Sequence, residues 1–119
     1  MRLWMTFAAV MGLVCVALGA FAAHGLRDPV AQGWMRTGAT YGLIHAVASL
    51  ACVALARAGA RGARHAPPLF LSGAAIFAGS LAAMALGGPR WLGAVTPVGG
   101  LLFLAGWGVL VWATRQLDP

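Results

Sequence analysis

The feature of this sequence that most limits its fold is a set of four long apolar runs, separated by short segments that carry the charges. The runs cover about residues 3–23, 37–56, 69–86 and 97–113. A helix needs about 20 residues to cross the hydrocarbon core of a bilayer, and the runs meet or approach that length. An open sheet would leave backbone groups unpaired in lipid, and the runs lack the alternation of a barrel. The sequence therefore predicts an all-α integral membrane protein, a compact antiparallel bundle of four transmembrane helices forming one domain over residues 1–119.

The charge of the chain supports the same conclusion. Only 8% of residues are charged, where a soluble domain has roughly 25%. The net charge of +6 comes from eight Arg set against Asp28 and Asp118. Because these Arg lie between the apolar runs and not along one helix face, they do not indicate nucleic-acid binding.

The distribution of Arg also predicts an orientation. One side of the predicted bundle carries Arg2, Arg57, Arg61, Arg64 and Arg115, and the other carries Arg27, Arg36 and Arg90. Positive residues are more frequent in cytoplasmic segments. We therefore expect both termini in the cytoplasm.

The connecting segments suggest local structure. Residues 24–36 are long enough for a short interfacial helix with Trp34 as an anchor, and residues 57–66 are basic, Gly-rich and expected to be flexible. Thr96 is expected to cap the fourth helix, with Pro97 as its first residue. Residues 92–95 would then lie in the interface or extend that helix beyond a kink.

Small residues at four-residue spacing predict close helix packing, which is what drives association in lipid. The stripes comprise Ala8 and Gly12; Gly38, Gly42 and Ala46; Ala75, Gly79, Ala83 and Gly87; and the Gly-rich fourth run. The same stripes could join protomers, or join the chain to a larger complex.

His45 is the one titratable group well inside a run, and intramembrane ionisable groups are a functional hypothesis by default. A neutral His that only fixes helix packing is the more frequent case. Counting 1.5 Å per residue from the predicted helix ends places His45 and Ser80 at similar depth. Tyr41 and Ser49 share the helix face of His45. We therefore predict an intramembrane polar layer of Tyr41, His45, Ser49 and Ser80.

Two possible ligand sites have simpler explanations. A bis-histidine haem on His24 and His45 is disfavoured because the two would lie about 12 Å apart in depth. On the non-cytoplasmic face, a lipid headgroup or small anion could bind His24, Arg27, Arg36, Arg90 and Thr96. Ordinary interfacial Arg, partly neutralised by Asp28, is the more frequent explanation. The sequence predicts no metal site and no cofactor.

Three segments of the chain resemble a known family. Residues 19–26 (GAFAAHGL) are similar to its G-A-F-x-A-H-G-L signature, residues 77–81 (FAGSL) to its F-S-G-S-L motif, and residues 92–107 (LGAVTPVGGLLFLAGW) to its L-G-x-I-T-P-I-G-G-L-L-F-L-A-G-W block. On these residues the chain resembles the bacterial domain-of-unknown-function 423 family, related to eukaryotic transmembrane protein 256. The resemblance implies a four-helix inner-membrane protein and supplies no biochemical activity to transfer. Gly42 and Ala78 stand where the family often has polar residues.

The sequence contains no paired carboxylates, Cys–His arrangement, phosphate loop or metal-ligand cluster that would indicate an enzyme. We therefore expect a non-enzymatic structural or accessory component in the lipid bilayer, docked to a larger complex or to itself. The alternatives are a small oligomeric transporter or channel, and a lipid- or anion-binding membrane protein.

Overall fold

The computed structural model describes all of residues 1–119, and it is a four-helix antiparallel bundle, as predicted. The long helices are α1 (Arg2–His24), α2 (Pro29–Arg57), α3 (Ala66–Ala85) and α4 (Thr96–Thr114). All four are long and apolar enough to cross a membrane. The molecule is 50 Å long and about half as wide. We call the two ends of the bundle the termini end and the opposite end.

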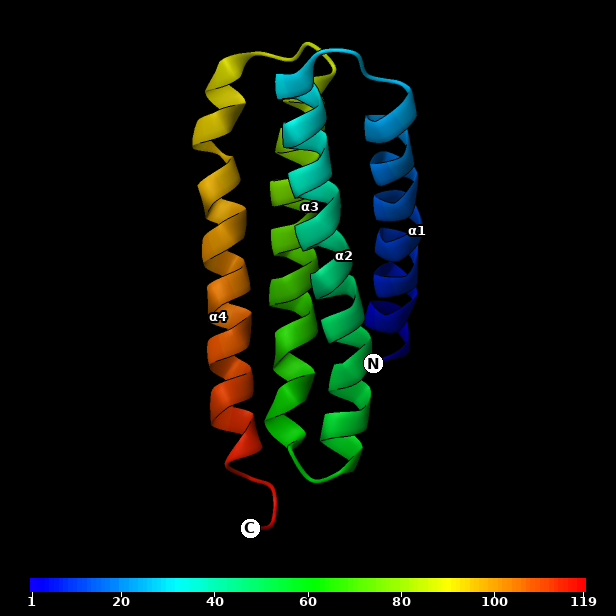
Figure 1. Ribbon diagram of the computed structural model, residues 1–119. Helices are drawn as coiled ribbons and strands as arrows, with labels where there is room; N and C mark the ends of the chain where they lie inside the picture. Colours follow the sequence, from blue (N-terminus) through cyan, green and yellow to red (C-terminus); the bar gives the residue numbers. More distant parts are fainter.

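The four helices do not contact one another equally. α2 and α3 lie at the centre, α1 packs mainly against α2, and α4 packs against α3 (Figure 1). α1 and α4 are therefore at opposite edges of the bundle. This arrangement leaves grooves between helices that are not direct neighbours.

The start of α2 corrects the sequence-based boundary. The helix begins at Pro29, so the short interfacial helix predicted in residues 24–36 is the first part of α2 itself. Asp28 caps it by accepting hydrogen bonds from the N–H groups of Val30 and Ala31, and Pro29 occupies a favoured first-turn position. Hydropathy marks only the part of a helix that is in lipid. At 29 residues and about 43 Å, α2 exceeds the ~30 Å core and extends beyond it.

The loops on either side of α3 each contain a 3₁₀ helix. Residues 57–66, expected to be flexible, contain the 3₁₀ helix η1 (Arg61–His65), in which Gly62 and Ala63 are buried. The Gly62 N–H donates to Gln116 Oε1 at 2.9 Å, which ties this loop to the end of α4. Residues 92–95 belong to a second 3₁₀ helix, η2 (Arg90–Ala94), and to the residue after it. This segment leads directly into α4, which agrees with the predicted extension of that helix beyond a kink.

Thr96 does not cap α4. The cap position is Val95, and the Thr96 hydroxyl instead donates to the carbonyl of Leu92 at 3.3 Å and pairs with Ser80 Oγ at 2.6 Å. The neighbouring helix α3 offers a hydroxyl at this point, so the side chain links two helices instead of closing its own first turn.

Glycines set the closest helix contacts. A Cβ on Gly99 would lie 2.7 Å from both the Gly73 carbonyl oxygen and the Phe77 nitrogen, so the α3 and α4 backbones touch there. A Cβ on Gly38 would lie 3.1 Å from Ala78 Cα, which marks a similar approach of α2 to α3. Such contacts provide the dense packing that holds helices together in lipid.

The small residues predicted to form a stripe on α3 are not all buried between helices. Gly38, Gly42 and Ala46 of α2 are buried between helices, as the packing interpretation expects. Ala75 and Gly79 of α3 are exposed, and a Cβ on Gly79 would meet nothing within 4 Å. Part of the small-residue pattern therefore faces the membrane.

Substitution of Gly99 tests the α3–α4 contact. We expect Gly99→Leu to lower the stability of the bundle by about 1–3 kcal/mol or more, because a new side chain would displace backbone and not a flexible side chain. Thermal unfolding in mild detergent measures the change. The matched control is Gly100→Leu, one residue along the same helix, where a Cβ meets nothing within 4 Å. Equal melting temperatures for the two variants would contradict the proposed contact.

Candidate functional site

His45 lies inside the bundle, on the side of α2 that faces α3 and α4. Its side chain is only 4% exposed. The Phe70 ring of α3 and the Phe103 and Trp107 rings of α4 surround it. His45 therefore contacts two other helices and does not face lipid.

Both ring nitrogens of His45 have protein partners. Nδ1 lies 2.6 Å from the carbonyl oxygen of Tyr41, one turn earlier in α2, and the Trp107 indole N–H donates to Nε2 at 2.9 Å. A carbonyl can only accept and an indole N–H can only donate. Together they select the neutral imidazole with its proton on Nδ1. His45 thus links α2 to α4 as a hydrogen-bond acceptor.

Stacking fixes the plane of the imidazole. The His45 and Phe103 rings are nearly parallel at 6°, with centroids 3.6 Å apart, and Phe70 packs at a tilt with its centroid 5.2 Å from that of His45. Since Phe103 and Trp107 are four residues apart, they project from the same face of α4. One ring holds the imidazole plane, and the other supplies its hydrogen bond.

The structure corrects the predicted polar layer. Ser49 is fully buried and donates to the carbonyl of His45 at 2.8 Å, so it satisfies its own helix. Ser80 does not pair with His45; its partners are Thr96 and the carbonyl of Phe77. Tyr41 contributes its backbone carbonyl to His45, while its side chain packs against Phe77.

The predicted depths of His45 and Ser80 do not match the structure, because they were counted from the predicted helix ends and α2 begins earlier, at Pro29. Gly38 lies against Ala78 in the structure. His45 is seven residues beyond Gly38 toward the termini end. Ser80 is two residues beyond Ala78 in the opposite direction, because the helices are antiparallel. The two side chains are therefore roughly 13 Å apart along the bundle.

The predicted anion-binding residues lie at the opposite end of the bundle, and the Thr96 hydroxyl is already paired with Ser80. His24, Arg27, Arg36 and Arg90 are all exposed at the opposite end of the bundle, and no ion pair joins any of them. The Asp28 carboxylate, expected to neutralise Arg, caps α2 instead. Arg90 alone has an organised contact, since its guanidinium carbon lies 5.8 Å from the centroid of the Trp34 ring. His24 is likewise distant from His45 in the fold, at the end of α1.

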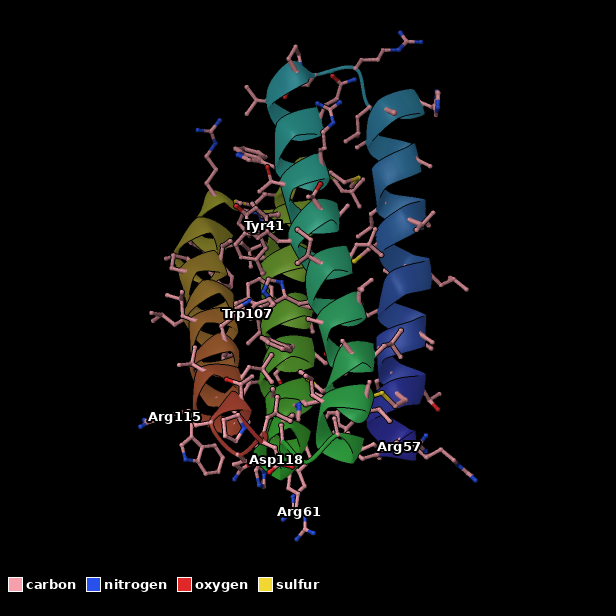
Figure 2. All side chains as sticks on the ribbon, turned by 60° about the horizontal axis from the view of Figure 1, so that its bottom comes forward. Tyr41, Arg57, Arg61, Trp107, Arg115 and Asp118 are labelled. Carbon is pink, nitrogen blue, oxygen red and sulfur yellow. The ribbon has the colours of Figure 1, made fainter.

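A groove lies between α2 and α4, with α3 as its floor. We call it the α2/α4 groove; its volume is about 380 Å³. It is lined by Tyr41, His45, Phe77, Gly100, Phe103, Leu104 and Trp107. Figure 2 shows Tyr41 and Trp107 between the two helices, with Tyr41 farther from the labelled Arg of the termini end. α2 and α4 are joined by side chains and not by direct backbone contact. The groove between them, lined in part by His45, is therefore open to the membrane.

A second groove lies between α1 and α3, with a volume of about 320 Å³. We call it the α1/α3 groove. It is lined by Trp4, Phe7, Val10, Met11, Val14, Leu71, Ser72 and Ala75. Its α3 wall is thus formed partly by the exposed small residues Ser72 and Ala75, and Gly79 continues the same face one turn further along.

Sequence reasoning missed Trp107 and Phe103 as the partners of His45. Trp in a membrane protein is usually assigned to an interface, where its N–H finds water. Trp107 lies eleven residues into α4, and an indole N–H there needs an acceptor from the protein. The pair at 103 and 107, four residues apart in an apolar helix, is the signal that could have identified it.

A double-mutant cycle tests the link between His45 and Trp107. Trp107→Phe leaves His45 Nε2 without a donor, and His45→Phe leaves the indole N–H without an acceptor. Each single substitution should cost about 1–3 kcal/mol of stability. The double variant should cost clearly less than the sum, because neither partner is then left unpaired. Additive losses, measured by thermal unfolding in detergent, would show that the hydrogen bond does not couple the helices.

Comparison with known proteins agrees with this architecture. The profile of the family described as "Protein of unknown function (DUF423)" matches residues 18–100. The chain is 41% identical to a UPF0382 membrane protein of Haemophilus influenzae, over 87% of this chain and 86% of the relative. It is 40% identical to the UPF0382 inner membrane protein YgdD of Escherichia coli K12, over 98% and 92%. It is also 36% identical to a UPF0382 membrane protein of Staphylococcus epidermidis, over 98% of each chain.

No solved structure matches the chain significantly. The family match covers more than half of the sequence, and the relatives align over nearly their whole length. The three segments quoted for the resemblance all begin within the matched residues 18–100. The chain therefore belongs to the DUF423 family of membrane proteins.

Proposed function

We propose that this protein is a non-enzymatic accessory component of the bacterial inner membrane, which docks to a transmembrane helix of a larger complex through the α1/α3 groove. The observation that carries the proposal is the exposed small-residue face of α3. Ser72, Ala75 and Gly79 leave the helix backbone accessible from the membrane. Helix association in lipid depends on such close approach.

The shape of the groove supports a helix as its occupant. Apolar side chains of α1, among them Phe7 and Met11, form one wall, and Leu71 with the small residues Ser72 and Ala75 of α3 forms the other. A helix seated there would contact a flexible, polarisable Met and an aromatic ring on one side and a near-flat backbone on the other. The bundle itself leaves this face unused.

Transport is the less favoured function. The buried polar residues of the chain are His45, Ser49 and Ser80. Each is hydrogen-bonded within the protein, and they do not form a continuous polar line through the bundle. A pore or ion path requires a lining of polar groups or carbonyls, which a single protomer does not offer.

A partner-capture experiment with matched variants tests the docking proposal. We expect the wild-type chain, purified in mild detergent, to retain the same membrane partner reproducibly by mass spectrometry. Gly79→Leu should reduce that recovery at least tenfold, because a new side chain would cover the docking face. Gly108→Leu should not, although its Cβ also meets nothing within 4 Å. Recovery of the chain alone, or equal loss from both variants, would contradict the proposal.

We further propose that both termini lie in the cytoplasm. Arg2, Arg57, Arg61, Arg64 and Arg115 belong to the termini end, and three Arg belong to the opposite end. Figure 2 shows Arg57, Arg61 and Arg115 projecting from that end. The excess of positive charge favours the cytoplasmic side.

Reporter fusions test this orientation. A green fluorescent protein fused after Pro119 should fluoresce, and alkaline phosphatase at the same point should be inactive. A fusion truncated after Gly88, in the α3–α4 loop, should give the reverse pattern. Active phosphatase at the C-terminus would mean that the bundle is inverted.

A further inference from the structure

Beyond the α2/α4 groove, toward the opposite end of the bundle, the face of α2 that carries Tyr41 and His45 also carries Trp34. Trp34, Tyr41 and His45 are separated by seven and four residues, so they project from the same side of the helix. The Arg90 guanidinium lies over the Trp34 ring. From the membrane surface inward, this line therefore presents a cation, a phenol and an apolar groove.

The charge of Arg90 has no partner in the protein. The chain has two carboxylate side chains; Asp28 caps α2, and Asp118 lies at the termini end (Figure 2). Arg90 is exposed and makes no ion pair. A guanidinium at the membrane surface, held over an aromatic ring, is suited to a phosphate group.

The Tyr41 hydroxyl also lacks a protein partner. The side chain is 48% exposed, and its ring packs against the Phe77 ring. Tyr41 lies twelve residues into α2, about 18 Å from its start, while α2 extends some way beyond the hydrocarbon core. At that depth a hydroxyl requires an acceptor, since water is scarce. The ester carbonyls of a phospholipid lie just below its phosphate, and they can accept a hydrogen bond from the Tyr41 hydroxyl.

Below Tyr41 the groove is shaped for a chain-like apolar group. Its volume of about 380 Å³ lies within the usual range for small-molecule sites, about 300–1,000 Å³. Its walls are Phe77, Phe103, Leu104 and Trp107, and Gly100 leaves one side open. Neither nitrogen of His45 is free at the base of the groove, because both have partners. An acyl chain needs no polar contact there.

We propose that the α2/α4 groove binds one anionic glycerophospholipid, with its phosphate at Arg90, an ester carbonyl at Tyr41 and an acyl chain along Phe103 and Trp107. The order of groups in such a lipid matches the order of these side chains. The site lies on a different pair of helices from the α1/α3 groove, so its occupation is independent of partner docking.

Native mass spectrometry of the full-length protein in mild detergent tests the site. The probes are phosphatidylglycerol and phosphatidylcholine with identical acyl chains. The wild-type chain should retain one phosphatidylglycerol about fivefold more strongly than phosphatidylcholine, the difference expected for one Arg near the surface. Arg90→Gln should remove this preference. Arg27→Gln, which deletes a charge from the same end of the bundle but outside the groove, should preserve it.

Variants within the groove separate a built site from general lipid adhesion. Gly100→Phe should fill the groove without disturbing the fold, since its Cβ meets no atom within 4 Å, and should lower retention of both lipids at least tenfold. Gly108→Phe, equally unhindered but outside the groove, should behave as wild type. Tyr41→Phe should weaken both lipids about two- to tenfold through the lost hydrogen bond.

Three results would overturn the proposal. Both lipids carry the phosphate and differ in net charge, so equal retention by the wild-type chain would contradict selection of an anionic lipid by Arg90. Indistinguishable behaviour of Gly100→Phe and Gly108→Phe would exclude the groove as the binding place. Conversion of an oligomer to a monomer by Gly100→Phe, with lipid retention unchanged, would show that a second copy of the chain occupies the groove.

Discussion

Close contact between helix backbones is the constraint on which this structure depends. Lipid is as apolar as the helices themselves, so burial from water does not drive them together. Gly73 and Gly99 let α3 and α4 touch, and Gly38 brings α2 against Ala78. These contacts place α3 between α2 and α4, because both of those helices pack on it through glycine. The remaining architecture follows from which helix pairs have such contacts and which do not.

α2 and α4 are a pair without a comparable backbone contact. They are joined by aromatic and imidazole side chains, through the hydrogen bond from Trp107 to His45 and the stacking of His45 on Phe103. Long side chains hold the helices farther apart than glycine would. The same interaction that satisfies the buried His45 therefore also creates the α2/α4 groove. Ser49 and Cys52, which bond to carbonyls four residues earlier, show the alternative, in which a polar group is satisfied within its own helix.

The sequence was sufficient for the number of spans and their approximate limits, because length and hydropathy in lipid leave few options. It misplaced the start of α2, since hydropathy locates the membrane and not the helix; Asp28 and Pro29 carried the missing signal. That error shifted the calculated depth of His45 and led to Ser80 as its partner. His45 itself was identifiable as the buried titratable group. Its true partner was not, because a comparison of depth among hydroxyl and titratable side chains leaves out the indole of Trp107.

The small-residue pattern illustrates what sequence spacing leaves open. Gly38 and Gly42 have the same spacing as Ala75 and Gly79, yet the first pair is buried and the second faces the membrane. The two pairs differ in whether another helix of the bundle packs against them, which sequence spacing does not specify. The result is a molecule with two unlike outer surfaces. The α1/α3 groove has a small-residue wall and no charge, which suits the close approach of another helix. The α2/α4 groove has protruding rings that would hold a helix backbone away, and a cation and a phenol above them that a helix would leave unpaired. A flexible lipid with its own phosphate and carbonyls meets those requirements better than a rigid helix does.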